Sequence, residues 1–565
     1  MPHLSLQPTP PYEPSGAREG KDGKEGKEKK PRIKVHASFD DLPASEWASL
    51  LGDLARPSRA GPIGDEPVEW RVHDKTHIEF AIDYPFAAED RSYVWEAFFF
   101  VPESFRIDDR TYGKKDMYED LLSYVRLAVP EVPFENLADE SSASGAQPLL
   151  GRLDEMLRKA AGAADGSRES AEAVRATRVF ACLVRASGLE AQRAMLSDLE
   201  LDGSPNASDQ RAVARFVTAA ARVAGAYREV VLRRGGAHLP DELQVALEWV
   251  DEDISLVLEA LSATASVQLQ SAAASSPPWG ELAARLAGHA VDEARYRKTR
   301  GWDSVGRADA TARDAEHLEF RRHVLKRFTS SVLWLTHEVR EAKVWVVHAL
   351  FAFAAALAMA FAVVVSIRAL QMQELLLPYM TLLVVSYAIK DRMKAVLQQK
   401  FQTWADTRFP DRRWTIRDHE RSQNVGEVLE RAGFRVFGEL PPAVLGARRL
   451  TRLHSLEESA RPERVLWHEK HVTVEPRKAG VLRSPMMTEI FRLNIGPWLR
   501  HTDDPNRKIT FADPDEASVY AATARRVYNL NIVYRLRGEA DKKAPWHRIR
   551  VVVSRKGIER IEPIL

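Results

Sequence analysis

The sequence predicts a multidomain α+β membrane protein with a two-helix transmembrane hairpin, a cytoplasmic helical bundle, and mixed α+β domains before the bundle and at the C-terminus. Three observations predict this class. An uncharged apolar run begins at Val344, a series of amphipathic helical stretches precedes it, and alternating strand patterns lie towards both ends of the chain. The length of 565 residues suits several folding units, since about 150 residues per domain is usual.

Composition confines the membrane part to one segment. The hydrophobic fraction of 45% and the charged fraction of 28% are ordinary for soluble globular proteins. The charge is uneven, because residues 407–565 carry 31 Lys/Arg and 21 Asp/Glu, a net of +10, whereas the whole chain carries +1 and the remainder therefore −9. Opposite charges favour either docking of the two parts or a basic part that faces anionic headgroups.

Cys182 is the only cysteine, which excludes an intramolecular disulfide and favours a reducing compartment. It lies in the apolar run Val179–Val184, so we expect a buried hydrophobe and not a nucleophile. The N-terminal residues lack the apolar core of a secretory signal, and the heavy use of Ala and Arg is typical of bacterial chains of GC-rich coding. These features predict a bacterial inner-membrane protein whose first part stays in the cytoplasm.

Two segments precede the predicted bundle. Residues 1–34 are rich in Pro, Gly, Lys and Glu and predict a disordered basic tail. Residues 35–135 predict a small α+β domain: Ile78 to Tyr84 alternates with polar neighbours, Tyr93 to Val101 is aromatic and β-prone, and Met117 to Val129 has helical spacing.

Residues 149–312 predict a helical bundle. Gly- and Pro-containing breaks divide this amphipathic sequence into about four to six helices; they lie at 162–166, 202–205, 235–236 and 276–278. The bundle has no inward Glu-x-x-His pairs of the di-metal type and is typical of a scaffold or docking surface. A heptad pattern from Leu318 to Val339 predicts a cytoplasmic stem helix over 313–343, and 390–406 predicts a second stem helix.

The transmembrane hairpin has one clear crossing and one shorter crossing. Residues 344–367 hold no acidic or basic side chain except His348, and about 20 apolar residues span a hydrocarbon core. Residues 375–389 are uncharged but cover only about 22 Å as a helix. We expect a second crossing, which can start near residue 369, and a re-entrant segment is the alternative. Residues 368–374 then form a short extracytoplasmic loop.

Basic residues lie beside both crossings on the same side. Arg340 and Lys343 precede the first crossing, and Lys390, Arg392 and Lys394 follow the second. The positive-inside rule therefore predicts a multi-pass inner-membrane protein with cytoplasmic N- and C-termini. The loop is too short for an extracytoplasmic domain, and two crossings enclose a transport pathway only when several copies assemble.

Two candidate sites lie within the hairpin. Ala352, Ala356 and Ala360 recur every four residues and form a candidate helix-packing face towards the second crossing or another copy; plain lipid-facing filler is the alternative. A similar series follows at Ala354, Ala358 and Ala362. We expect His348 at the same height as Ser386 and Tyr387, with which it forms a candidate intramembrane polar contact. The alternative is an interfacial imidazole that reaches the headgroups.

Residues 407–565 predict a basic α+β domain with C-terminal antiparallel strands, because Tyr528 to Leu536 and Ile549 to Val553 alternate and a turn precedes Ile558. Trp546, Arg548 and Arg550 form a candidate face for anionic lipid or nucleic acid. The acidic residues of this domain favour an ordinary mixed surface, and nucleic acid is the less favoured ligand.

The sequence predicts no catalytic, cofactor-binding or metal-binding residue. His468-Glu469-Lys470-His471 resembles a shortened zinc-protease motif, but the alternation around it predicts a strand, on which residues three apart point to opposite faces. His73 and His77 have the spacing of helical zinc ligands, yet they flank a turn between two predicted strands. The sequence has no phosphate-binding P-loop motif and no nucleophile elbow.

These features favour a membrane-anchored scaffold or adaptor, whose partners are the lipid bilayer and either other proteins or further copies of the chain. One alternative is a membrane-tethered enzyme with a site built from residues distant in sequence. Another is binding of anionic lipid or nucleic acid by the C-terminal domain. A pocket with converging titratable groups would favour the enzyme, and an exposed apolar patch would favour the scaffold.

Overall fold

The computed structural model describes residues 68–564 with gaps at 87–91, 140–148, 200–203, 235–237, 274–277, 308, 342, 371–375, 420–422, 450–462, 476–485, 516–517, 539–540 and 542. The predicted tail (1–34) and most of the predicted loop (368–374) lie outside the described residues. Helices and strands both occur along the described chain, so the mixed α+β class is confirmed.

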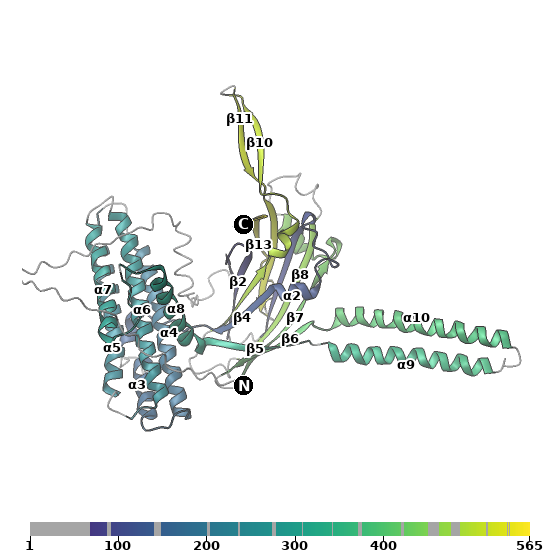
Figure 1. The fold of residues 1–565 in the computed structure, drawn as a ribbon, viewed down its shortest axis with the longest axis horizontal. Coiled ribbons are helices and arrows are strands. Elements are labelled where there is room, and N and C mark those ends of the chain that lie inside the picture. Colours follow the sequence, from purple (N-terminus) through teal and green to yellow (C-terminus); the bar gives the residue numbers. More distant parts are fainter. Residues whose placement is uncertain are drawn as a thin grey trace, which may run out of the picture. The chain divides into compact units, whose positions relative to one another are not determined.

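Twelve strands form one sheet in which all neighbouring pairs run antiparallel (Figure 1). The order across the sheet is β1-β2-β9-β4-β5-β6-β7-β8-β3-β12-β13-β14. The strands are β1 (Val68–Val72), β2 (His77–Pro85), β3 (Ser92–Pro102), β4 (Leu121–Leu127), β5 (Trp334–Glu341), β6 (Arg412–Asp418), β7 (Gln423–Arg435), β8 (Glu463–Val474), β9 (Met486–Asn494), β12 (Tyr528–Gly538), β13 (His547–Ser554) and β14 (Gly557–Ile564). The N–H of Ile558 on β14 donates to the carbonyl oxygen of Lys75 beside β1 at 2.7 Å, so the sheet is nearly closed.

The segments predicted as two α+β domains, 35–135 and 407–565, contribute to this single sheet. β3 lies between β8 and β12, with Phe99 opposite both Leu466 and Ile532. β2 pairs with β9 over its whole length. The chain therefore has one sheet where the sequence predicts two units, because strand pairing across some 400 residues leaves no local pattern in the sequence.

Aromatic side chains fill the inside of the sheet. Phe80 stacks on Phe491 with ring centroids 4.8 Å apart, and Trp95 stacks on Tyr534 at 5.4 Å. All four are buried, because alternate residues of each strand face inward. Each such pair contributes roughly 0.5–1.5 kcal/mol beyond the area that it buries.

Shorter elements complete this part of the chain. α2 (Lys114–Asp120) leads directly into β4, and Val444 of α11 (Pro442–Arg449) packs in one apolar cluster with Phe100 outside the sheet. β10 (Asn506–Asp513) and β11 (Ser518–Arg525) form a separate two-stranded ribbon. The described 3-10 turns with their bounds are η1 (Glu103–Phe105), η2 (Phe134–Ala138), η3 (Ser331–Leu333), η5 (Phe437–Glu439) and η6 (Gly496–His501).

Helices α3 to α8 pack side by side (Figure 1). They are α3 (Leu149–Ala160), α4 (Arg168–Ser197), α5 (Ala207–Arg234), α6 (Asp241–Ala273), α7 (Trp279–Arg300) and α8 (Ala312–Ser330). Their ends coincide with the Gly- and Pro-containing breaks in the sequence: α3 ends before Gly162, and α7 begins after Pro278. These residues end helices because Gly favours the left-handed conformation past a helix end and Pro lacks the N–H of a helix interior.

The predicted stem helix over 313–343 does not form as one helix. α8 ends at Ser330, and Trp334–Glu341 form strand β5 between β4 and β6. The heptad pattern there is overridden by the hydrogen bonds that β5 makes with β6, where Val339 lies opposite Trp414.

Two helices lie between β5 and β6 in the chain, and they pack against each other as a helical hairpin (Figure 1). They are α9 (Val344–Ala369) and α10 (Leu376–Arg408). α10 is continuous, so the predicted second crossing (375–389) and second stem helix (390–406) are parts of one helix.

Candidate functional site

Among the described helices, α9 alone has the length and apolar composition to cross a membrane. Its 26 residues cover about 39 Å at 1.5 Å per residue. Only 11% of the residues in its most apolar window are buried. A core helix of a soluble domain is covered on most sides, whereas the described part of the chain leaves most of the apolar surface of α9 uncovered.

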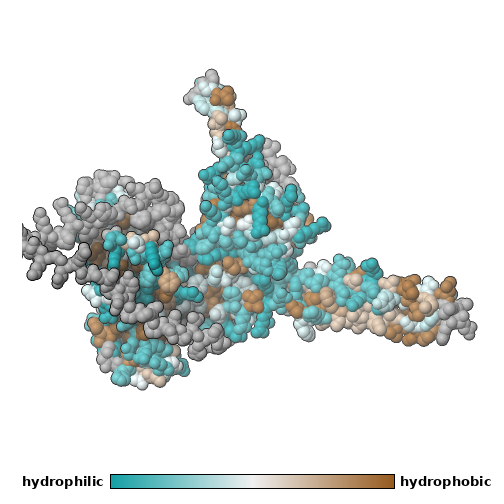
Figure 2. Space-filling view, in the orientation of Figure 1, coloured by the Kyte–Doolittle hydropathy of each residue, from teal (hydrophilic) through white to brown (hydrophobic). Residues whose placement is uncertain are grey.

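The exposed apolar surface continues onto the first part of α10. Leu377 is 82% exposed and Val384 is 68% exposed. Figure 2 shows hydrophobic residues over the end of the hairpin where the two helices meet, and hydrophilic residues on α10 towards the sheet. We call residues 356–369 of α9 and 377–389 of α10 the turn-side half, and the remainder the base-side half.

α9 packs on α10 through one of its two alanine series. Ala354 and Ala358 are buried where the helices meet, and small side chains let two backbones approach closely. Ala352, Ala356 and Ala360, the predicted packing face, are exposed on the opposite side of α9. Their predicted role as a helix-packing face stays a prediction, and the helix that they would contact belongs to another copy of the chain.

The predicted contact between His348 and Ser386 or Tyr387 does not form. His348 and Tyr387 are exposed, Ser386 donates to the Leu383 carbonyl oxygen at 3.1 Å, and no hydrogen bond among the described residues joins His348 to either partner. The reason is the register of the hairpin: Phe353, near His348, lies beside Phe401 with ring centroids 6.1 Å apart. His348 is therefore level with the C-terminal end of α10, several turns from Ser386.

A cluster of charges ties the hairpin to the sheet at its base. The Lys343 ammonium pairs with Asp406 near the end of α10 and with Asp411 at 2.9 Å. Asp411 also accepts from Lys114 Nζ at 3.0 Å and from the Tyr118 hydroxyl at 3.2 Å. Burial raises the pKa of Asp411, but Lys343 and Lys114 outweigh it and hold this pKa below its usual value.

Charged side chains of α10 are level with the second half of α9. Lys343 pairs with Asp406, and Phe353 lies beside Phe401. Equal rise along two packed antiparallel helices then places Lys390 at about the height of residues 359–364 of α9. From there towards the sheet, α10 carries Lys390, Asp391, Arg392, Lys394 and Lys400.

A polar pocket of about 570 Å³ contains part of the predicted anionic-ligand face. Arg548 and Arg550 both line it, as their shared strand face predicts. Trp546 packs instead on Phe98, with ring centroids 5.7 Å apart, and Arg535 lies over its ring at 4.3 Å.

Carboxylates compensate the arginines of this pocket. Arg448 pairs with Glu463 at 2.7 Å, Arg526 with Asp503 at 2.5 Å, and Arg550 with Glu562 at 3.5 Å. Arg548 donates to Asn531 Oδ1 at 2.8 Å and to the Arg448 carbonyl oxygen at 2.6 Å. The pocket is thus a mixed-charge surface.

Four titratable side chains meet inside the sheet. Glu430 of β7, His468 and Lys470 of β8, and Glu489 of β9 are each 1% exposed. His468 Nε2 lies 2.6 Å from Glu430 Oε1, and Lys470 pairs with Glu489 and lies 3.7 Å from Glu430. The Tyr84 hydroxyl donates to Glu489 at 3.0 Å. These acids and bases neutralise one another, which is the condition for keeping charges in an interior.

The sequence did not point to this cluster as a site. His468 and Lys470 are two residues apart on one strand, so the alternation places both on the same face. Their acidic partners come from neighbouring strands, and only the strand order reveals them. None of the four side chains lines the 570 Å³ pocket.

The two histidine motifs occupy the strand positions that the sequence predicts. His468 faces the interior, whereas the His471 side chain is 49% exposed. His73 and His77 flank the turn between β1 and β2, with ring centroids 6.3 Å apart. Within the described part of the chain, no group of three or more His, Cys, Asp or Glu side chains is placed to hold a metal ion.

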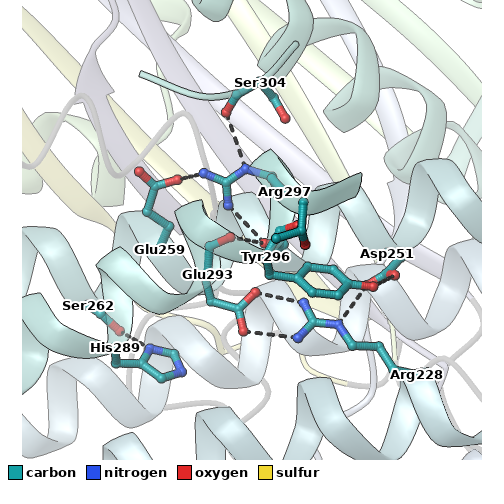
Figure 3. A network of polar contacts seen from close by, with 11 residues as sticks. Arg228, Asp251, Glu259, Ser262, His289, Glu293, Tyr296, Arg297 and Ser304 are labelled. Carbon is teal, nitrogen blue, oxygen red and sulfur yellow. Dashed lines mark hydrogen bonds and ion pairs between the residues drawn. The ribbon is translucent and has the colours of Figure 1, made fainter. Parts of the chain in front are cut away.

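A polar network links α5, α6 and α7 (Figure 3). Arg228 of α5 donates to Asp251 of α6 at 3.0 Å and to Glu293 of α7 at 2.7 Å, and its guanidinium lies 3.6 Å from the Tyr296 ring centroid. Arg297 of α7 is fully buried and donates to the Ser255 hydroxyl at 2.8 Å. The network joins the three helices, and none of its residues lines the 570 Å³ pocket described above.

Comparison with protein-family models, curated protein sequences and solved structures gave no match. The candidate function therefore depends on the geometry of the chain itself, in which the exposed apolar surface of α9 and the first part of α10 is the most distinctive feature.

Proposed function

We propose that this protein is a membrane-anchored scaffold or adaptor, held in the bilayer by the turn-side half of the α9–α10 hairpin. The observation that carries the proposal is the exposed apolar surface of α9. Covering apolar surface is favourable by about 25 cal/mol per Å². Hydrocarbon covers a long apolar helix and leaves no backbone polar group unsatisfied, since the helix bonds are internal.

The proposal includes two crossings of a bacterial inner membrane, with both termini in the cytoplasm. Lys343, Lys390 and Arg392 lie on the base side of the hairpin, and Arg368 lies at the turn. If the turn stopped at the bilayer centre, Arg368 would cost roughly 2.5–3.5 kcal/mol or more. When the turn crosses to the far side of the bilayer, Arg368 lies among the headgroups and its charge carries little cost. This favours a full crossing over a re-entrant segment.

The uncharged part of α10, residues 376–389, is short for a crossing. It covers roughly 20 Å, against about 30 Å for a hydrocarbon core. Local thinning of the bilayer and long basic side chains that reach the headgroups accommodate such a mismatch. Lys390 already bends back over the Tyr387 ring, with its ammonium 3.9 Å from the ring centroid.

The adaptor role is favoured over catalysis by two observations. The converging titratable groups of the sheet interior are sealed from solvent, and the arginines of the 570 Å³ pocket are largely compensated by carboxylates. The bundle and the sheet instead offer folded surfaces to protein partners, as a scaffold requires.

Fractionation of cells that express the full chain tests the anchor. We expect the parent chain to stay with membranes after an alkaline carbonate wash and to be released by detergent. Ile367→Arg with Val384→Arg places two charges on exposed positions of the turn-side half, at roughly 2.5–3.5 kcal/mol each, and should abolish stable insertion. The matched control is Val245→Arg with Val396→Arg, at exposed positions on α6 and on the base-side half of α10.

A parent chain that is soluble without detergent would contradict the anchor, and reporters at the two termini on opposite faces of the membrane would contradict the topology. The adaptor role is tested separately by crosslinking in cells and identification of the linked proteins. A chain recovered with no stable protein partner would leave only the anchor.

A further inference from the structure

The base-side half of α9 has an apolar face that lipid tails do not cover. Trp345, Ala349, Ala352 and Ala356 are exposed on the side of α9 opposite the buried Ala354 and Ala358, with Trp345 at 78%. Residues 3, 4, 7 and 11 apart share one helical face. We call these four residues the outer α9 face.

The neighbouring helix keeps this level out of hydrocarbon. Lys390, Asp391 and Arg392 are consecutive and point in three directions about 100° apart, so no rotation of α10 shields all of them from lipid. Lys394 and Lys400 follow nearer the sheet. Hydrocarbon therefore ends near the level of Lys390. The outer α9 face lies on the base side of that level, where water would otherwise meet it.

We propose that the outer α9 face is the interface with a second copy of this chain, in which two α9 helices pack in parallel around a twofold axis along the membrane normal. The inference rests on the proposed function, because a shared bilayer gives both copies the same orientation and depth. The same residues of two copies then meet at the same height, which makes the face complementary to itself.

Charge favours this arrangement over contacts through α10. Between Lys390 and Lys400, α10 carries four basic side chains and one acidic one, so the α10 helices of two copies repel each other. The outer α9 face carries no charged side chain. A dimer through α9 covers the apolar face and leaves both α10 helices on the outside, in contact with water and headgroups. Ala352 and Ala356 then permit close approach of the two backbones.

Disulfide crosslinking of the full chain in isolated membranes tests the interface. Cys182 is buried and its pKa is raised to about 12, so the parent chain should give no dimer under mild oxidation. Ala352→Cys and Ala356→Cys should each shift the chain to the mass of a disulfide-linked dimer, because Cα atoms about 5.5–6 Å apart suit a disulfide. Ala354→Cys, on the buried side of α9, and Val396→Cys, exposed on α10, should leave it monomeric.

Each result decides between supporting and overturning the interface. The interface is supported if the Cys variants at 352 and 356 form disulfide-linked dimers and those at 354 and 396 do not. An equal amount of dimer in the Cys variant at 396 would indicate random collision and overturn the interface. A chain that stays with membranes but forms no dimer with Cys at 352 or 356 would also overturn it. The last result leaves the membrane anchor intact. A chain found in the soluble fraction overturns the anchor, and dimer formation at 352 in that fraction still decides the interface.

Discussion

At the scale of single residues, burial determines the chemistry of the only thiol. Cys182 is 5% exposed, and its Sγ–H donates to the Thr329 carbonyl oxygen at 3.3 Å. Burial raises its pKa to about 12, although Arg185 nearby opposes this rise. The sequence predicted a buried and unreactive cysteine from its apolar neighbours. The burial is confirmed, and the lack of reactivity stays a prediction.

Cys182 should therefore stay protonated and unmodified at pH 8 in the folded chain. Thiolate is the species that reacts with maleimides and aromatic disulfides, and it is scarce when the pKa lies far above the pH. We expect no labelling of the native chain in detergent and one label per chain after denaturation, measured by mass spectrometry. Rapid labelling of the native chain would contradict this prediction.

Glu430 makes stability depend on pH. Burial raises the pKa of its carboxyl, but Lys470 and His468 outweigh burial and hold this pKa below the usual 4.5. A carboxylate with a lowered pKa stabilises the fold at pH values above its unfolded pKa, and this contribution is lost as pH falls through the folded pKa. Its contribution is thus complete at neutral pH.

Glu430→Gln should lower the free energy of unfolding by roughly 3 kcal/mol at pH 7, because it removes the buried carboxylate that pairs with His468 and lies beside Lys470. The difference in free energy of unfolding between variant and parent should become smaller below about pH 4, where the parent carboxyl takes up its proton. Thermal unfolding in detergent between pH 3 and pH 8 measures this difference. Glu427→Gln, on the same strand but with a side chain 37% exposed, is the control, and a difference independent of pH would refute the argument.

At the scale of elements, α6 connects the bundle through three consecutive acidic residues. Asp251 pairs with Arg228 of α5, Glu252 with Arg321 of α8, and Asp253 with Arg185 of α4. Consecutive helical residues point about 100° apart, so three neighbours in sequence reach three different helices. The sequence shows the acidic run, but their arginine partners lie in helices whose packing it does not specify.

Asp253→Ala should destabilise the bundle by about 3 kcal/mol, because it leaves Arg185 buried without its carboxylate. The midpoint of urea denaturation, followed by helical circular dichroism, measures the loss. Asp292→Ala removes an exposed partner of Arg295 on α7 and should change stability by less than about 0.5 kcal/mol. Equal effects of the two substitutions would show that burial is not the cause.

The helices of the hairpin were predicted unequally well. α9 is evident in the sequence because 24 uncharged residues in a row need only one-dimensional information. The prediction of a stem helix was wrong because the pattern around Val332 and Val339 fits both a heptad and a strand. The hydrogen bonds between β5 and β6 favour the strand. The predicted position of His348 beside Ser386 was wrong because α10 continues past Ile389 to Arg408. The start of α9 therefore lies beside the end of α10.

At the scale of the whole molecule, closure of the sheet depends on one glycine. Gly557 has φ of +131°, and a Cβ placed on it would lie 2.2 Å from the Lys75 carbonyl oxygen. That oxygen accepts from Ile558 N–H and links the β14 edge to the turn beside β1. A side chain at 557 therefore clashes with the contact that brings the two edges together.

Gly557→Ala should destabilise the sheet by roughly 1–3 kcal/mol, from backbone strain and loss of this hydrogen bond. Gly225→Ala in α5, where nothing lies within 4 Å of the added Cβ, should be neutral or stabilising by up to about 1 kcal/mol. Thermal unfolding compares them, and faster hydrogen exchange at the β1 and β14 edges should accompany the first substitution only. An unchanged melting temperature for Gly557→Ala would show that closure contributes little.

The sequence predicted the classes of most segments but not their assembly. Alternation identified β2, β3 and the three C-terminal strands, and Gly and Pro placed the helix breaks of the bundle. It did not predict that β2 and β9, some 400 residues apart, are neighbours, since nothing local encodes that pairing. The interior cluster of Glu430 and its partners was missed for the same reason.

The α9–α10 hairpin leaves the sheet after β5 and returns to it at the adjacent strand β6, so the proposed anchor can be removed without cutting the sheet. Glu341, at the end of β5, lies directly opposite Arg412, at the start of β6. A tight Asn-Gly turn joins strands with such a spacing. A chain in which this turn replaces the residues between Glu341 and Arg412 should fold without detergent and give the circular dichroism of the sheet and bundle. Aggregation of this shortened chain would mean that the excised helices also support the fold in water.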